Sequence, residues 1–294
     1  MRLACPLCGG PSSFVFKTQD RNRRISDEPF NYRRCEVCSA IFLADPPADM
    51  SLYYPDEYYV LPTDGQLERA LRTERYKLDL IKPYAADGRL VEIGPGAGMF
   101  AHAARDAGYE VTGVEMDARA CTHLRDVIGV EAVESDSPAR ALADLPPSRV
   151  IAMWHVLEHL TDPWVCLEAA ARNLEPGGVL ALAMPNPAAF QFRLTRGRWP
   201  HVDAPRHLFL IPAGLLDERA RAVGLELAAL TARDRGGIYW NRFGWQYLLM
   251  RPRPSRPRIA FALAFGFGVS TLMAPIERTD LRGSTYTAVL RKST

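Results

Sequence analysis

A glycine-rich turn between a predicted strand and a predicted helix constrains the fold of this chain more than any other feature. The short apolar run Arg89–Ile93 is followed by Gly94, Gly96 and Gly98, and the helical pattern of Met99–Ala107 comes next. Glycines let the backbone approach a ligand closely, and the first turn of a helix offers free N–H groups. The segment therefore predicts a strand–turn–helix unit that binds a ligand at its turn.

Strands and helices alternate along most of the chain. The predicted strands are 89–93, 110–114, 149–154, 178–184, 225–231 and 285–290. The predicted helices are 66–85, 99–107, 118–128, 163–174 and 212–223. Alternation at this spacing indicates βαβ units and a parallel sheet, so the fold class is α/β.

Composition limits the functions to consider. The 294 residues are 48% apolar and 24% charged, which is typical of a chain with a packed core. The formal charge of +2 is too small to indicate nucleic-acid binding by itself. Cys5 follows the first residues without an apolar run, so we expect no secretory signal and a reduced, cytoplasmic protein.

The spacing of the turn narrows the ligand. A nicotinamide-type fingerprint needs its third glycine at the position of Met99, whereas here it is Gly98, and no Gly-Lys-Ser/Thr follows as a Walker loop requires. Glu92 is the second constraint. A carboxylate beside the turn repels a pyrophosphate but attracts the ammonium and sulfonium groups of S-adenosylmethionine (SAM).

This segment resembles the first motif of class I methyltransferases, and the similarity continues through residues 88–186. The resemblance implies that Glu115 binds the ribose hydroxyls, that Asp136 contacts the adenine amino group and that His155 lies beside the cofactor. The implied SAM-binding residues are Glu92, Gly94, Gly96, Gly98, Glu115, Asp136 and His155. It also implies a Rossmann-like, seven-stranded, mostly parallel sheet, with the antiparallel last strand 285–290 between the fifth and sixth.

Other interpretations of these residues stay open. Glu115 could be a solvated acid at a strand end, and Asp136 a loop residue or helix cap. His155 and His159 have the i,i+4 spacing of metal ligands, but the zincin pattern places Glu directly after the first His. Asn186 lies in a Pro-Asn-Pro segment that follows the fifth strand, not the fourth as in amino-methylating enzymes, which favours a simple turn.

Four cysteines form two Cys-x-x-Cys pairs, Cys5 with Cys8 and Cys35 with Cys38. Each pair places two thiolates on a tight turn, as tetrahedral zinc requires, and four thiolates leave no open position for catalysis. The sequence therefore predicts a small N-terminal ribbon with a structural zinc, with a redox pair as the alternative. Cys121 and Cys166 lie in helical patterns and are predicted to be core residues.

The order of these parts resembles a bacterial family associated with the methylation of sugars, polysaccharides and natural products. A zinc-ribbon-like module with a tyrosine-rich linker is predicted at 1–62, and a methyltransferase domain at 63–294 with insertions at 187–210 and 251–276. The linker tyrosines are Tyr53, Tyr54, Tyr58 and Tyr59. The catalytic histidine and tyrosine motifs of related sugar C-methyltransferases are not recognisable, so C-methylation is not implied.

The acceptor side is predicted within 187–210. Its segment from Trp199 to Leu208 resembles one in the same family and supplies His207 as the first candidate base, with His155 and His159 as competitors. His207 could instead order its loop. Asp203 and Arg206 are candidates for acceptor binding, although Arg206 could equally pair with Asp203.

An apolar stretch at 259–276 is about as long as a membrane span, and arginines between Arg251 and Arg258 flank it. In the implied topology both ends of the stretch return to one sheet, which a single crossing does not allow. Docking on anionic lipid at the inner face of the membrane, a dimer helix and a lid stay open.

The combined prediction is a cytoplasmic SAM-dependent methyltransferase, with O-methylation of a sugar-containing or other small metabolite, including a lipid-linked one, as the first choice. One alternative is an RNA methyltransferase that grips RNA through the basic residues Arg21, Arg23, Arg24, Arg33 and Arg34. Another is a non-catalytic SAM-binding scaffold or regulator. A homodimer is compatible with all three.

Overall fold

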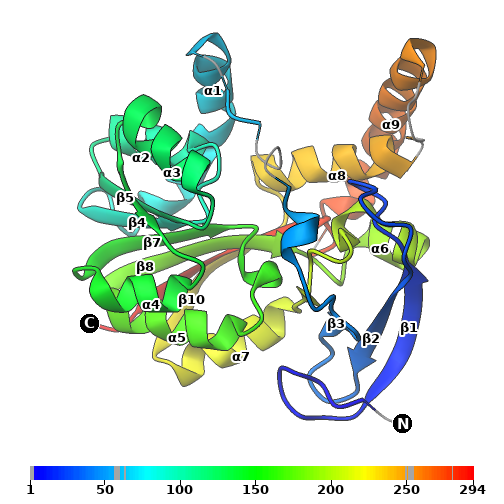
Figure 1. Cartoon of the computed structure of the whole chain (residues 1–294), viewed down its shortest axis with the longest axis horizontal. Helices are drawn as coiled ribbons and strands as arrows, with labels where there is room; N and C mark the ends of the chain where they lie inside the picture. Colours follow the sequence, from blue (N-terminus) through cyan, green and yellow to red (C-terminus); the bar gives the residue numbers. More distant parts are fainter. Residues whose placement is uncertain (1–2, 56–59, 63, 249, 251–254, 280) are drawn as a thin grey trace. The chain divides into compact units, whose positions relative to one another are not determined.

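The computed structural model describes residues 3–55, 60–62, 64–248, 250, 255–279 and 281–294, so Tyr58, Tyr59 and the segment 251–254 lie outside the described residues. The chain forms two compact units (Figure 1). The first unit comprises 1–53, 184–216 and 231–287, and the second comprises 54–183, 217–230 and 288–294. This division differs from the contiguous one expected at residue 62. The reason is that a strand of the N-terminal module, Ile41–Leu43, pairs with Phe209–Leu210 of the predicted acceptor insertion.

A seven-stranded sheet is the framework of the second unit, and only the ends of three of its strands belong to the first unit. Its strands are β4 (Arg89–Ile93), β5 (Glu110–Glu115), β6 (Glu131–Glu134), β7 (Ser148–Trp154), β8 (Leu174–Pro185), β10 (Leu225–Thr231) and β11 (Thr285–Lys292). Their order is β10-β11-β8-β7-β4-β5-β6, and β4 pairs in parallel with both β5 and β7. The last strand is antiparallel and lies between β10 and β8, which confirms the predicted fold class.

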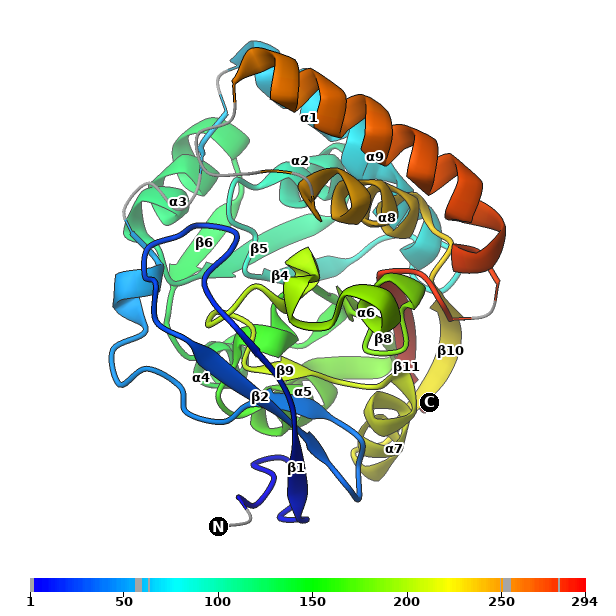
Figure 2. The same cartoon turned by 90° about the vertical axis from the view of Figure 1, so that its right-hand side faces the viewer.

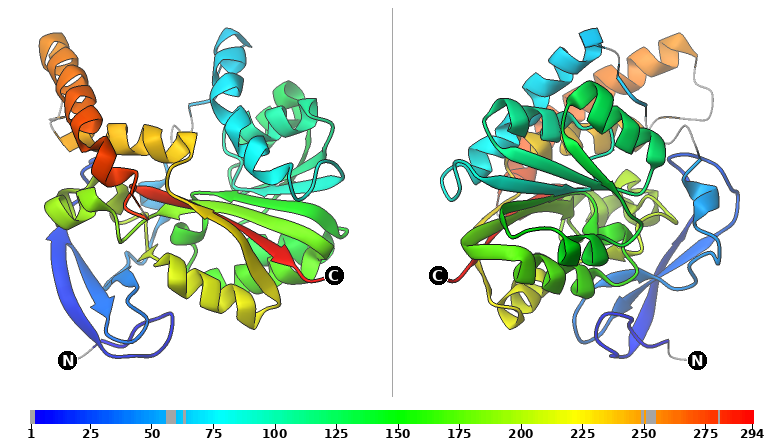
Figure 3. Two further views of the ribbon diagram at one scale, coloured as in Figure 1. Left: turned by 180° about the vertical axis from the view of Figure 1, so that it is seen from behind. Right: turned by 60° about the vertical axis from the view of Figure 1, so that its left-hand side comes forward.

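Helices cover both faces of this sheet, as Figures 1 and 3 show. They are α1 (Asp64–Ile81), α2 (Met99–Asp106), α3 (Ala118–His123), α4 (Pro138–Asp144), α5 (Pro163–Asn173) and α7 (Ala213–Ala222). The central strands are buried on both faces, which explains why they appear in the sequence as continuous apolar runs and not as alternating ones.

Four elements of the sheet and its covering helices differ from the prediction. Helix α1 ends at Ile81, four residues before the predicted end, because Lys82 precedes Pro83 and the residue before a proline disfavours helical dihedrals. The helix predicted over 118–128 changes after His123 into a π-helical turn, η2 (Leu124–Ile128). Strand β6 and helix α4 were not predicted, because their apolar patterns are too short to distinguish from a loop.

The first unit contains a second, antiparallel sheet in the order β1-β2-β3-β9. Its strands are β1 (Ser12–Thr18), β2 (Phe30–Cys35), β3 (Ile41–Leu43) and β9 (Phe209–Leu210), and the short helix η1 (Ser51–Tyr53) follows β3. The side chains of Tyr32, Ile41 and Phe42 are fully buried in it. The N-terminal module is therefore built on a real apolar core as well as on its cysteines.

Most helices of the first unit lie in the two predicted insertions, and α8 lies in the segment before the second insertion. They are α6 (Phe190–Thr195), the 3₁₀ helices η4 (Arg196–Arg198) and η5 (Pro200–Val202), α8 (Arg235–Leu248) and α9 (Arg256–Glu277). Figure 2 shows α8 alongside α9. A Cβ atom at Gly266 of α9 would lie 2.4 Å from Gln246 Cγ of α8, so glycine is required for this close approach.

Helix α9 is the apolar stretch of the sequence, and most of it is exposed. Within the described residues it is the one helix long and apolar enough to cross a membrane, and only 11% of its most apolar window is buried. Phe261, Phe265, Phe267 and Leu272 are all exposed. Ala262 and Gly266 are buried, so only a narrow side of α9 packs against α8.

Candidate functional site

The glycine turn lies at the carboxyl end of β4, as predicted. Gly94, Gly96 and Gly98 all have positive φ, at 65°, 53° and 74°, a conformation that favours glycine. A Cβ atom at Gly94 would lie 2.8 Å from Val156, and one at Gly98 would lie 2.7 Å from Leu124. The turn therefore depends on glycine for its dihedral angles and for its close packing, and it leads directly into α2.

Glu115 connects this turn to the end of β5. Its Oε2 accepts the N–H of Gly96 at 3.0 Å, and its Oε1 accepts the N–H groups of Met116 at 2.8 Å and Asp117 at 3.1 Å. Burial raises the pKa of Glu115, and these three N–H donors act in the opposite direction. The carboxylate is thus held rigidly, and Oε2, which accepts one N–H group, keeps a lone pair for a ligand hydroxyl.

Glu92 is a buried acid without a complete set of partners. Its Oε2 has no hydrogen-bond partner within the described parts of the chain. Burial raises the pKa of Glu92 to about 8, although the positive charge of Lys77 in α1 lowers it. Lys77 Nζ lies 4.7 Å from the ring centre of Trp154, at the end of β7. An unsatisfied buried carboxylate favours a cationic ligand, which fits the ammonium or sulfonium of SAM.

Asp136 follows β6 and is exposed in the loop before α4. Glu134, at the end of β6, is in register with Glu115 of β5. The loops after β4, β5, β6 and β7 thus leave one edge of a parallel sheet, where ligands of α/β proteins bind. The structure brings together the predicted cofactor residues of these loops, whereas the specific contact of Asp136 with adenine stays a prediction.

Two histidines follow β7. His155 has a positive φ of 59°, and its Nδ1 lies 3.4 Å from Oε1 of the buried Glu158. Nδ1 of His159 lies 3.0 Å from the hydroxyl of Tyr54, a contact that the sequence did not predict. A positive φ at a non-glycine residue is frequent at functional sites, which supports a functional role for His155.

A family model described as a methyltransferase domain matches residues 64–230, more than half of the chain. The chain belongs to the methyltransferase domain family. Together with the fold, this match identifies a SAM-dependent methyltransferase. The matched range contains all the glycines and acids of the edge described above.

Curated relatives agree with this family. A ubiquinone biosynthesis O-methyltransferase of Pseudomonas fluorescens is 28% identical over 177 residues, which cover 56% of this chain and 73% of the relative. The enzyme of the same name from Ruegeria pomeroyi is 28% identical over 202 residues, 65% of this chain and 76% of the relative.

Solved structures support the fold of the methyltransferase. A putative sarcosine dimethylglycine methyltransferase from Galdieria sulphuraria has a TM-score of 0.53 at 14% identity, covering 83% of this chain and 97% of that one. A SAM-dependent methyltransferase from Archaeoglobus fulgidus has a TM-score of 0.51 at 16% identity, covering 83% and 100%.

The four N-terminal cysteines of the methyltransferase gather in one cluster. Their sulfur atoms all lie within 4.8 Å of one another, with Cys5 and Cys38 at 3.8 Å and Cys8 and Cys35 at 3.3 Å. A tetrahedral zinc with Zn–S distances near 2.3 Å needs sulfur separations of about 3.8 Å. The spacing therefore fits a metal ion, and none of the six cysteines forms a disulfide.

Local backbone geometry supports this cluster. Gly9 and Ser39, one after each pair, have positive φ values of 73° and 62° and close the two turns. The N–H groups of Val37 and Cys38 both point at Cys35 Sγ at 3.4 Å. Burial alone would raise the pKa of Cys35, but these donors, together with the thiols of Cys8 and Cys38, outweigh it and lower the pKa to about 7, so the thiolate forms more easily there than at an ordinary cysteine.

The predicted acceptor residues lie in the first unit. Arg206 is fully buried and donates to Asp203 at 2.8 Å and Asp20 at 2.6 Å. Of the two roles considered for Arg206, this geometry favours pairing with Asp203. His207 is also buried, and its Nδ1 lies 2.9 Å from the carbonyl of His201, which is the loop-ordering contact considered as its alternative.

Sequence reasoning missed three residues of these sites. Lys77 belongs to a helix that carries no motif, and Tyr54 belongs to the tyrosine-rich linker, for which the sequence predicted no role. Only the folded chain places them beside Glu92 and His159. Asp20 lies in a polar loop where an acid is ordinary. No pattern in one sequence distinguishes these side chains from solvent-exposed ones.

Proposed function

We propose that this methyltransferase transfers the methyl group of SAM to an oxygen of a small metabolite, either a sugar-containing or a lipid-linked one. The observation that carries the proposal is the cofactor edge, where an unsatisfied Glu92, three positive-φ glycines and Glu115 converge. The printed names of the relatives, O-methyltransferases of ubiquinone biosynthesis, support oxygen as the acceptor atom.

SAM fits this edge by the chemistry of its groups. Glu92 would attract the cationic end of the cofactor, and Oε2 of Glu115 would accept a hydrogen bond from a ribose hydroxyl. Bound SAM supplies an electrophilic methyl group. The chain itself holds the reactants in line and removes the proton of the acceptor.

We propose His155 as the base that takes this proton, ahead of His159 and His207. Its ring projects from the loop that packs against the glycine turn, since Val156 contacts Gly94. Glu158 lies beside its Nδ1, so the carboxylate can orient the imidazole and stabilise it when protonated. His207 is buried and bonded to its own loop, which supports a structural role.

The cysteine cluster is proposed to hold one structural zinc. Four thiolates complete the tetrahedron, so the metal would stabilise the sheet of the first unit without touching the reaction. The short sulfur separations support zinc over a redox pair, because a redox pair would explain only two of the four cysteines.

Helix α9 is proposed to contact a membrane surface. Exposed apolar side chains lie on several sides of it, and Arg256 and Arg258 at its start suit anionic headgroups. A soluble surface helix normally has one apolar stripe. Contact with lipid would bring the enzyme to a lipid-linked acceptor at the inner face of the membrane, whereas a dimer interface through α9 is the alternative.

The direct test is transfer of radiolabelled methyl groups from SAM into an extract of cells that lack the protein, followed by fractionation. Label in small-molecule, polysaccharide or lipid fractions supports the proposal. Label confined to RNA contradicts it and favours the RNA methyltransferase. SAM binding without label in any fraction favours the scaffold. The His155→Gln variant is expected to lose about a hundredfold or more in rate while it still binds SAM.

A further inference from the structure

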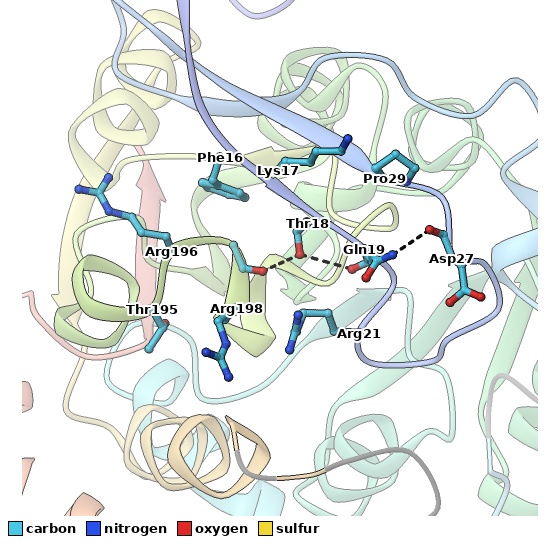
Figure 4. Close-up of a pocket in the computed structure, with 11 residues that line it drawn as sticks. Phe16, Lys17, Thr18, Gln19, Arg21, Asp27, Pro29, Thr195, Arg196 and Arg198 are labelled. Atoms are coloured by element: carbon cyan, nitrogen blue, oxygen red, sulfur yellow. Dashed lines mark hydrogen bonds between the residues drawn. The ribbon is translucent and has the colours of Figure 1, made fainter.

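Two arginines, Arg21 and Arg198, line two neighbouring pockets of the first unit. The larger pocket, of about 700 Å³, is also lined by Lys17 and Arg196 (Figure 4). The smaller one, of about 410 Å³, is also lined by Arg24. In Figure 4 both arginines appear on the opposite side of Thr18 from Lys17. No proposed step of methyl transfer uses these residues.

The loop that carries Arg21 and Arg24 is wound around a buried acid. The carboxylate of Asp20 accepts the N–H groups of Arg23 at 3.1 Å and Ile25 at 2.9 Å, and it pairs with Arg206. Arg24 has a positive φ of 58°, which is unusual for a residue with a side chain. The contacts of Asp20 therefore fix the backbone of the loop, from which the exposed Arg21 and Arg24 extend.

Arg198 is fixed by a second turn, in η4. The Thr18 hydroxyl donates to the carbonyl of Gly197 at 2.5 Å, and a Cβ atom at Gly197 would lie 2.8 Å from the carbonyl of Lys17. Arg196 has a positive φ of 49°. Because this turn lies tightly against β1, only glycine fits at position 197, between Arg196 and Arg198. Both arginines therefore line the larger pocket.

These positive charges lack ionic partners. Among the described residues, no carboxylate forms an ion pair with Arg21, Arg24 or Arg198. Burial lowers the pKa of Arg21, and the charges of Arg198 and Arg24 lower it further. Of the two acids that line the smaller pocket, Asp20 is paired with Arg206, which leaves Asp27. The charge of guanidinium groups that repel one another is compensated when an anion binds between them.

We propose that the pocket lined by Arg21, Arg24 and Arg198, called here the arginine pocket, binds the phosphate or diphosphate group of a small molecule. Guanidinium groups match phosphate oxygens in geometry and charge. Tyr247, Asn22 and Ser26 line the same pocket and offer further polar contacts.

The test is isothermal titration of the full-length protein with inorganic pyrophosphate at low salt, without SAM. We expect binding that weakens about tenfold or more in Arg198→Ala and in Arg21→Ala, because each removes a charge-assisted contact. Arg198→Lys should be intermediate, since it keeps the charge but not the fork. Arg233→Ala is the matched control: Arg233 is an exposed arginine of the same unit outside both pockets, and its removal should leave affinity unchanged.

Three outcomes would overturn the proposal: no binding of pyrophosphate to the wild-type protein, equal weakening in Arg233→Ala, or tighter binding of a single-stranded oligoribonucleotide through the same arginines. Binding to phosphatidylglycerol vesicles that is lost in Arg198→Ala, with no binding of pyrophosphate, would overturn the proposal as well, because the site would then take a lipid headgroup and not a small molecule. A cooperative thermal unfolding transition in each variant is the control that the variant is folded. Because the titration contains no SAM, its failure leaves the proposed methyl transfer intact, and failure of methyl transfer leaves this site intact.

Discussion

At the residue scale, the sequence identifies groups by their motifs, but their electrostatic state depends on burial. Glu92 and Glu115 were predicted from their places beside the glycine turn and at the end of a strand. Their partners were not predictable, because Lys77 and the three backbone donors reach them only in the folded chain. Arg206 illustrates the same limit, since its burial with Asp20 depends on a residue 186 positions away.

The raised pKa of Glu92 predicts that SAM binding depends on pH. In the ligand-free protein this carboxyl group has a pKa of about 8, so it is mostly protonated at neutral pH. A cationic ligand favours the ionised form, and binding must therefore release a proton. Affinity should rise by up to about tenfold per pH unit between pH 6 and 8 and level off above it. Calorimetric titration with SAM across this range measures the slope.

The Glu92→Gln variant tests whether Glu92 is the group that releases the proton. It keeps the shape of the side chain but has no proton to release, so the pH dependence should disappear and affinity at pH 8 should fall. A slope that persists unchanged in Glu92→Gln would show that another group titrates. Glu110→Gln, an exposed acid at the opposite end of β5, is the matched control and should bind as the wild type does.

At the element scale, strands and most helices of the sheet were predictable because apolar periodicity follows burial. Helix α8 was not predicted: Gly236, Gly237 and Gly244 give it a low intrinsic helix propensity, and packing against α9 stabilises it. The pairing of β3 with β9 was also missed, since a two-residue strand leaves no periodic signal.

Zinc removal should unfold the N-terminal part of the first unit. We expect about one zinc per chain in the wild type, and Cys35→Ser should lose most of it together with a lower melting temperature. Metal analysis and thermal unfolding measure both. Cys121→Ser, at a buried thiol of α3, should keep its zinc. A wild-type protein that holds no zinc after purification without chelators would contradict the proposed metal site.

Membrane contact by α9 predicts cosedimentation with vesicles. Phe261→Ser together with Phe265→Ser removes two exposed stacked rings whose centres are 5.9 Å apart, and the bound fraction on phosphatidylglycerol vesicles should fall severalfold. Phe14→Ser, an exposed ring of β1, is the control. If the double variant binds vesicles as the wild type does but becomes monomeric from a dimer, α9 is a subunit interface.

At the scale of the whole molecule, the fold class and strand order followed from the alternating pattern and the family resemblance. The division into units did not, because 184–216 and 231–287 join the N-terminal residues through contacts that are distant in sequence. The cofactor edge belongs to the second unit, where each predicted loop leaves the same side of the sheet.

The central claim is that this edge binds SAM through Glu115. Calorimetric titration with SAM should show binding that Glu115→Gln weakens by about tenfold or more, because the neutral amide accepts a weaker hydrogen bond from a ribose hydroxyl than the carboxylate does. Glu134→Gln is the matched control, since Glu134 is exposed at the end of the adjacent strand, in register with Glu115. Its affinity should match that of the wild type. Equal SAM affinity in all three proteins, or no SAM binding by the wild type, would contradict the claim.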